Sequence, residues 1–233
     1  MRTTRKKAIR RKKGTRMAAG VLLALVICLC YHLYASVFHH GGIISRALGR
    51  IETSGGNGEG QVISFGDLKV TQQLLSVSEN SRPGRKMKKV NGIVIHYTGN
   101  PGTTAAANRN YFQSLAYDKS NYASAHFVVG LEGEIVQCVP LDEEAITTRG
   151  RNGDTIGIEV CHPDAGGKFN DCTYESLIKL TALLCDKFGL TEADVMRHYD
   201  VTGKICPKYY VEHEDAWEKM IQDISMELHQ SVR

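Results

Sequence analysis

Two histidines and one cysteine of this chain have the types and the spacing of a metal site with three protein ligands. His198 and Cys206 stand eight residues apart with the turn sequence Thr202-Gly203 between them, so both side chains can converge from the two ends of one loop. His96 follows an apolar segment and supplies a third donor. Two neutral imidazoles and one thiolate would hold zinc and leave a fourth position open. The spacing alone does not exclude the alternative that the three are unrelated core and surface residues that form no metal site.

Alternating strand and helix patterns must position these donors. Apolar, β-branched segments predict buried strands over residues 90–96, 125–129, 134–139 and 155–161. Capping residues and helical periodicity predict helices over residues 103–116, 173–188 and 212–228. Such a mixture predicts an α/β domain around a central sheet, with His96 at the end of the first strand.

The start of the chain has the pattern of a membrane anchor. Residues 1–16 contain nine Lys or Arg and no acidic residue, and residues 17–38 contain no formal charge. About 20 apolar residues cross a bilayer as a helix, and a basic flank stays on the cytoplasmic side. We therefore predict a basic cytoplasmic tail over 1–16, a single-pass transmembrane signal anchor over 17–38, and an extracytoplasmic remainder at the cell membrane.

Two other fates of this segment are less favoured. A cleaved signal peptide needs a small-x-small site, but Ala35 is preceded two positions earlier by the bulky Leu33. A lipid-modified cysteine is also disfavoured, because bulky residues precede both Cys28 and Cys30. Whether the anchor is cleaved stays open.

Composition divides the rest of the chain in two. Residues 39–67 are rich in glycine and predict a flexible linker, and residues 68–229 have the composition of a globular domain. The whole chain has 29 basic and 25 acidic residues, so removing the nine basic residues of the tail leaves a net charge of −5. An electrostatic partnership of the domain with nucleic acid is therefore not expected.

Five cysteines lie outside the apolar segment, and five is an odd number, so at least one thiol lacks an intradomain partner. A disulfide between Cys161 and Cys172 is undecided by the sequence. The chain has no C-x-x-C pair, no H-E-x-x-H helix and no G-x-S-x-G elbow, which removes support for three common kinds of site.

Four ordered motifs resemble one enzyme family. They are Gly92-Ile93-Val94-Ile95-His96-Tyr97-Thr98, Ala123-Ser124-Ala125-His126-Phe127-Val128-Val129, Ile156-Gly157-Ile158-Glu159-Val160 and the segment from His198 to Pro207. Together they are similar to the zinc-dependent N-acetylmuramoyl-L-alanine amidases, the family that includes phage T7 lysozyme and the peptidoglycan recognition proteins. The resemblance covers about residues 68–228.

The resemblance implies a mixed sheet flanked by helices, and cleavage of the amide between N-acetylmuramic acid and L-alanine in peptidoglycan. Position by position, it implies His96, His198 and Cys206 as zinc ligands. It also implies Glu159 as the proton-accepting residue and Lys204 as the cation that stabilises the oxyanion. An exposed acid at a strand end and an ordinary loop cation are the respective alternatives.

Two departures from the family pattern affect the expected substrate contacts. Some members carry a catalytic tyrosine where this chain has Ala125, which shifts proton handling toward Glu159. Many members carry an aromatic-His pair where this chain reads Ala145-Ile146-Thr147-Thr148. Replacement contacts could come from Arg149, Arg151 or Asn152. His126 could touch substrate, orient a ligand, or be a hydrogen-bonded core histidine.

The sequence thus predicts a membrane-anchored, monomeric bacterial cell-wall amidase with zinc as cofactor and peptidoglycan as partner. The rival from another class is a non-catalytic peptidoglycan-binding receptor on the same fold, which would typically lack the cysteine ligand. A phage lysis enzyme would use identical chemistry. Muramidase activity is disfavoured because no carboxylate pair is suggested at a common site. The stem-peptide type is left open.

Overall fold

The structure is a computed structural model, and it describes residues 60–230. Seven strands form one mixed sheet in the order β1-β2-β5-β4-β6-β3-β7. The strands are β1 Gln61–Phe65, β2 Leu68–Gln72, β3 Gly92–Tyr97, β4 Phe127–Val129, β5 Ile135–Gln137, β6 Thr155–Val160 and β7 Val195–Arg197. Strands β4, β6, β3 and β7 run parallel, whereas β5 is antiparallel to β4, and β1 is antiparallel to β2.

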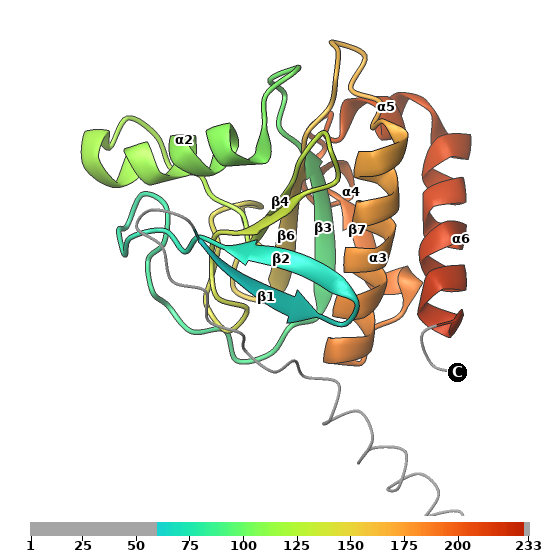
Figure 1. Ribbon diagram of the computed structural model, residues 1–233, viewed down its shortest axis with the longest axis horizontal. Helices are drawn as coiled ribbons and strands as arrows, with labels where there is room; N and C mark the ends of the chain where they lie inside the picture. Colours follow the sequence, from blue (N-terminus) through green and yellow to red (C-terminus); the bar gives the residue numbers. More distant parts are fainter. Residues whose placement is uncertain (1–59, 231–233) are drawn as a thin grey trace, which may run out of the picture. The chain divides into compact units, whose positions relative to one another are not determined.

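The helices lie on both faces of this sheet (Figure 1). They are α2 Ala105–Asp118, α3 Asp171–Phe188, the short 3-10 turn η1 Glu192–Asp194, α4 His198–Thr202, α5 Lys208–Glu212 and α6 Glu214–Gln230. Helices α3 and α6 lie side by side over one face, and α2 lies on the other side of the sheet (Figure 1). The expected α/β fold with a mixed central sheet and flanking helices is confirmed.

The alternation of side chains along the central strands gives the sheet two different faces. On one face, Ile93, Ile95, Ile156 and Ile158 join the apolar residues of α3 and α6 in a continuous core. The opposite face carries His96, Gly157 and Glu159, because β3 and β6 pair in parallel with His96 opposite Glu159. A second, smaller core on that side packs against α2. The face that carries His96 and Glu159, called the polar face below, is therefore where a site can form.

Several boundaries differ from the sequence prediction. The predicted linker is wrong over residues 61–67, because Ile63 and Phe65 pack against the core while Val62 and Ser64 face outward, which makes β1 a strand. Helix α3 begins earlier than predicted, with Asn170 rather than Thr173 as its N-cap. The last predicted helix corresponds to α6, which begins two residues later than predicted, and the short helix α5 precedes it.

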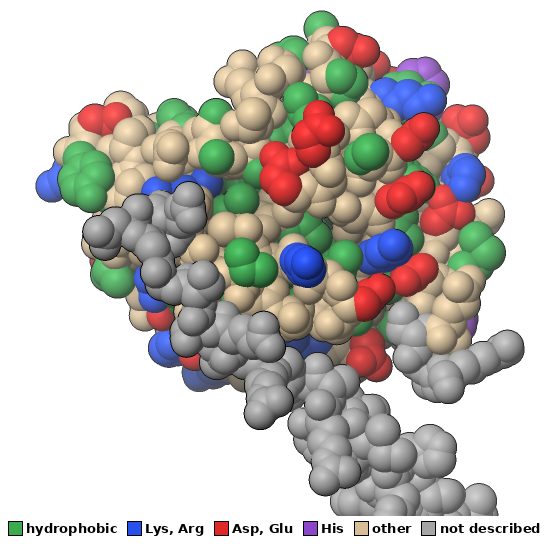
Figure 2. All heavy atoms as spheres, viewed as in Figure 1, with side chains coloured by type: hydrophobic (Ala, Val, Ile, Leu, Met, Phe, Trp, Pro, Cys, Tyr) green, Lys and Arg blue, Asp and Glu red, His purple; other side chains and the backbone are tan. Residues whose placement is uncertain are grey.

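The predicted cytoplasmic tail and membrane anchor lie outside the described residues. Between residues 60 and 230, no helix is both long enough and apolar enough to cross a membrane. Acidic and basic side chains are interspersed over the side of the domain that carries α3 and α6 (Figure 2). Lys219 and Asp223 of α6 form one such ion pair, with 2.6 Å between Nζ and Oδ2.

Candidate metal centre

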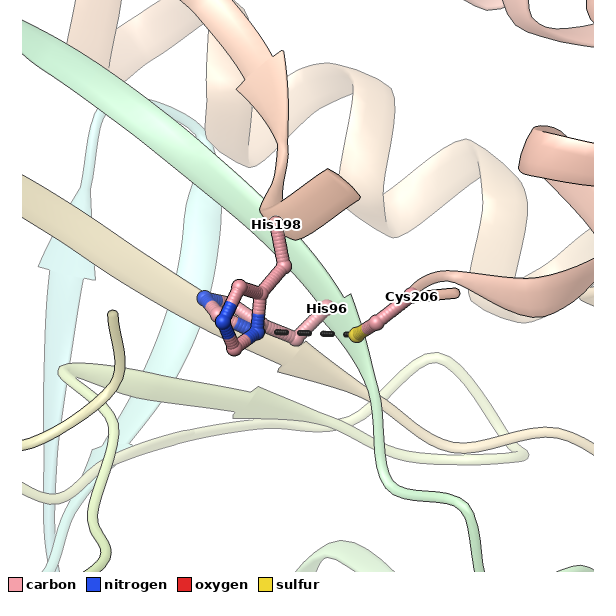
Figure 3. Close-up of side chains that lie close together, drawn as sticks. All are labelled: His96, His198 and Cys206. Atoms are coloured by element: carbon pink, nitrogen blue, oxygen red, sulfur yellow. Dashed lines mark hydrogen bonds between the residues drawn. The ribbon is translucent and has the colours of Figure 1, made fainter. Parts of the chain in front are cut away.

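The three predicted donors come together at the carboxyl ends of β3 and β7 (Figure 3). The Nδ1 atoms of His96 and His198 are 3.0 Å apart, and the Cys206 sulfur lies 3.8 Å from His96 Nδ1. All three donor atoms lie within 4.8 Å of one another. Their side chains are buried, with 1%, 8% and 1% exposure respectively. Two imidazole nitrogens and one sulfur therefore face a single point.

Strand register and one short helix produce this convergence. Ile95 of β3 pairs with Arg197 of β7, so the next residue of each strand, His96 and His198, emerges at the same level. Helix α4 then turns the chain and ends at Gly203, whose φ of 78° is a left-handed conformation suited to glycine. The Tyr199 amide donates to the Cys206 carbonyl at 3.0 Å, which returns the thiol to the histidines.

Arg197 holds this helix to the rest of the domain. Its guanidinium donates to the Asp200 carboxylate at 2.8 Å and to Glu214 of α6 at 2.7 Å. It also lies 5.1 Å from the ring centroid of Trp217. Because Arg197 precedes His198 directly, these contacts fix the backbone from which His198 projects.

The electrostatics of the three donors suit a divalent cation. Burial lowers the pKa of His96 well below its usual value, and burial also lowers the pKa of His198. Burial raises the pKa of the Cys206 thiol to about 12, and the negative charge of Glu159 acts in the same direction. The imidazoles are thus neutral with free lone pairs, and the thiol ionises at neutral pH only beside a strong positive charge.

This donor set fits zinc. Ligands bound tetrahedrally at about 2.0–2.3 Å lie roughly 3.3–3.6 Å from each other, close to the separations of His96 Nδ1 from the other two donors. Two imidazole nitrogens at 3.0 Å without a shared cation would leave two lone pairs facing each other or one proton between them. A zinc ion would satisfy all three donors at once.

The predicted acid and the predicted cation both lie near this centre. Glu159 is opposite His96 in the sheet, and its Oε2 atom is buried with no hydrogen-bond partner among the described residues. Desolvation by burial raises the pKa of Glu159 to about 8, and the positive charge of Lys204 opposes that rise. The same charge of Lys204 lowers the pKa values of His96 and His198. Glu159 is therefore not an exposed acid at a strand end.

His126 is a core residue, and the expected substrate contact is not supported at its position. The side chain is fully buried. The Gly157 amide donates to His126 Nδ1 at 3.0 Å, so the ring carries its proton on Nε2 and donates it to the Glu143 carbonyl at 2.9 Å. Burial lowers the pKa of His126 to about 4. Both nitrogens are occupied by the protein itself.

Two of the other predicted substrate contacts, Arg151 and Asn152, also have internal partners. Arg151 donates to Asp154 at 2.8 Å. Its guanidinium lies beside Gly92, at the amino end of β3, whereas His96 lies near the carboxyl end. The loop of Arg151 thus reaches the amino end of the strand, and the expected substrate contact of Arg151 stays a prediction. The Asn152 Oδ1 atom accepts hydrogen bonds from the amides of Thr147 and Thr148, which organises the loop instead of leaving that oxygen free.

One contact of the centre escapes sequence analysis. The Thr148 hydroxyl lies 3.0 Å from His96 Nε2, on the opposite side of the ring from the converging donors. Thr148 belongs to an irregular loop, where neither strand nor helix periodicity predicts which side chain points inward. The undecided disulfide is absent, because Cys161 and Cys172 are both free thiols.

Comparison with known proteins identifies one family that resembles this chain in sequence and structure. The family profile described as N-acetylmuramoyl-L-alanine amidase matches residues 86–209. The chain is 33% identical over 156 residues to a probable N-acetylmuramoyl-L-alanine amidase of Bacillus licheniformis, covering 62% of this chain and 44% of that protein. It is 34% identical over 168 residues to the N-acetylmuramoyl-L-alanine amidase BlyA of Bacillus subtilis, covering 63% of this chain and 44% of BlyA.

The catalytic domain of XlyA has a similar structure. Its TM-score is 0.58 at 29% sequence identity, and the match covers 67% of this chain and 99% of that domain. The chain thus spans less than half the length of the two curated relatives described above but nearly all of this catalytic domain. With the profile match extending over more than half of its residues, the chain belongs to the N-acetylmuramoyl-L-alanine amidase family.

Proposed function

We propose that this protein hydrolyses the amide between the lactyl group of N-acetylmuramic acid and L-alanine in peptidoglycan, with zinc as its cofactor. The observation that carries the proposal is the convergence of His96, His198 and Cys206 beside the unpartnered carboxylate of Glu159. The family to which the chain belongs supports the same reaction. These three residues would hold the ion.

Amide hydrolysis needs a strong nucleophile and a stabilised oxyanion. When bound, zinc supplies Lewis acidity, which lowers the pKa of water and polarises a carbonyl. The reaction joins the water oxygen to the lactyl carbonyl carbon and breaks the bond from that carbon to nitrogen. Its products are a carboxylate on the sugar and a free amino group on L-alanine.

Glu159 would move the proton in this reaction. Its carboxylate accepts a proton from the attacking water and delivers it to the nitrogen of the departing L-alanine. Burial suits this double role, because a carboxyl whose pKa is raised to about 8 both binds and releases a proton near neutral pH. Ala125 is buried and apolar, so no hydroxyl from that position shares the task.

Lys204 would stabilise the charge that develops on the carbonyl oxygen. It is an exposed residue of the loop between α4 and Cys206, yet its charge acts on His96, His198 and Glu159. A flexible ammonium at this place can approach the substrate oxygen as negative charge accumulates. Retention of Cys206 in the centre is the reason to favour an enzyme over a non-catalytic peptidoglycan receptor.

One experiment separates these activities. Purified cell wall is digested with the full-length protein, and new amino termini and new reducing sugars are both assayed. An amidase releases L-alanine amino termini without reducing sugars. Reducing sugars alone would indicate a glycosidase, and binding to the wall without either product would indicate a receptor.

We also propose that the protein is a single-pass membrane protein with residues 17–38 as an uncleaved anchor and its amidase domain outside the cytoplasm. The charge asymmetry between residues 1–16 and the apolar segment supports this topology. Peptidoglycan would then be within reach of a monomer tethered at the membrane. Protease added to cells without walls should digest the domain and spare the tail. A mature protein in the medium that begins near residue 36 would contradict the anchor.

A further inference from the structure

The loop that precedes β6 lies against the polar face of the sheet, beside His96. Glycine at position 157 permits this approach, because a Cβ atom there would be 2.4 Å from Thr147 Cγ2 and 2.5 Å from Thr147 Oγ1. Any larger residue at position 157 would push the loop away from the sheet. The close approach brings the next residue, Thr148, to the ring of His96.

The hydroxyl of Thr148 is fully buried and has a defined orientation. Its oxygen lies 3.0 Å from His96 Nε2 and 3.4 Å from the Thr147 hydroxyl, to which it donates. With its own proton directed at Thr147, the Thr148 oxygen accepts the proton of His96 Nε2. A neutral imidazole has one N–H, so a proton on Nε2 leaves the lone pair on Nδ1, the atom that faces His198 and Cys206.

Asn152 fixes the backbone that carries this hydroxyl. Its Oδ1 atom accepts from the Thr148 amide at 2.7 Å and from the Thr147 amide at 3.1 Å. The Thr148 carbonyl in turn accepts from the Arg151 amide at 2.9 Å, which closes the loop. Hydrogen bonds to its own amide and carbonyl therefore position Thr148. A bound ion is not needed to place it.

We propose that Thr148 is a positioning residue for the metal centre: its hydroxyl selects the Nε2–H tautomer of His96 and fixes the ring so that Nδ1 is presented to zinc. The inference rests on the proposed function, in that zinc is taken as the ion. Histidines that bind metals usually donate their second ring N–H to such a partner, and loss of that partner weakens metal binding about 10- to 100-fold.

The test compares three variants of the full-length protein in detergent. Zinc affinity is measured by competition with a chromophoric chelator. Thr148→Val keeps the shape but removes the acceptor, and affinity should fall about 10- to 100-fold. Thr148→Ser keeps the hydroxyl and should restore affinity to within a few-fold of wild type. Thr181→Val is the matched control, because Thr181 is equally buried in α3 and its hydroxyl has no partner among the described residues.

A second measurement uses the unaltered protein and does not depend on the folding of a variant. Nitrogen-15 NMR of the metal-free chain should show His96 protonated at Nε2. Protonation at Nδ1 would overturn the assignment, as would a folded Thr148→Val variant that binds zinc as tightly as wild type. Wild-type protein that binds no zinc would instead refute the proposed function, which distinguishes the two failures.

Discussion

Two buried histidines stand on the same face of the sheet, and their surroundings differ. His126 has one nitrogen bonded to the Gly157 amide and the other to the Glu143 carbonyl. His96 has one nitrogen bonded to the Thr148 hydroxyl, and its other nitrogen faces His198 and Cys206. Burial is complete or nearly so at both positions. A histidine available to a metal is thus distinguished by a nitrogen that faces other potential ligands instead of the backbone, and not by its exposure.

The largest loss of activity should follow removal of one of the two donors that face His96. Cys206→Ser and His198→Ala should each reduce zinc occupancy and abolish turnover, because two remaining donors hold the ion poorly. Occupancy is measured by elemental analysis and turnover by release of L-alanine amino termini. His126→Gln is the control, and it should retain zinc. Full activity of both donor variants after exhaustive chelation would refute the site.

Glu159→Gln should leave zinc bound and reduce kcat by about 10²-fold or more, because the amide keeps the shape of the carboxylate but cannot accept a proton. Binding of wall fragments should change far less than kcat, since the lost interaction belongs to the transition state. Glu134→Gln, in the turn before β5, is a suitable control. Near wild-type turnover with full zinc occupancy would exclude Glu159 as the base.

Lys204→Met should reduce kcat about 10²- to 10³-fold if Lys204 has the proposed role, because the variant retains most of the aliphatic stem and loses the cation proposed to stabilise the oxyanion. Steady-state kinetics on soluble wall fragments would separate kcat from KM. Lys208→Met offers a comparison a few residues along the chain, since that ammonium donates to the Ala165 carbonyl. Equal losses in both variants would show that Lys204 has no special role.

The smallest expected effect comes from His126 and concerns the free energy of unfolding. The folded protein holds the pKa of His126 at about 4, below the value of about 6.5 in an unfolded chain. Between these values the unfolded state binds one more proton, so the free energy of unfolding falls as pH drops from about 6.5 toward 4. From pH 7 to pH 5 this histidine should cost the metal-free protein about 2 kcal/mol.

Urea unfolding followed by fluorescence of Trp217, the single tryptophan, measures this change. His126→Gln should have a lower free energy of unfolding at pH 7 and a shallower pH dependence than wild type. The difference between the two slopes isolates His126 from the other buried histidines. Identical slopes would mean that His126 does not have a depressed pKa.

The sequence predicted the central elements well because their patterns are local. Strand β3 and helix α2 agree with prediction to within two residues at each end, since apolar β-branched runs and an N-cap threonine are strong signals. Strand β1 was missed because its alternation is short and follows a glycine-rich segment. Strand β7 has three residues, too few for a periodic signal.

The site was predictable only where spacing or family resemblance carries information. His198 and Cys206 share one loop, so their convergence could be anticipated from the sequence. The internal partners of His126 and Arg151 depend on strand register and loop path, which the sequence does not reveal. Thr148 illustrates the same limit, since its approach to His96 requires that a glycine of another strand be aligned beside it.

The short strand β7 has a further consequence for association between molecules. It forms one edge of the sheet, and its three residues lead directly into α4. An exposed edge strand can recruit a strand from another copy, but so few backbone groups form a poor template. Direct passage into a helix diverts the chain before a longer edge can develop. The same turn that delivers His198 to its partners thus protects this end of the sheet from edge-to-edge aggregation.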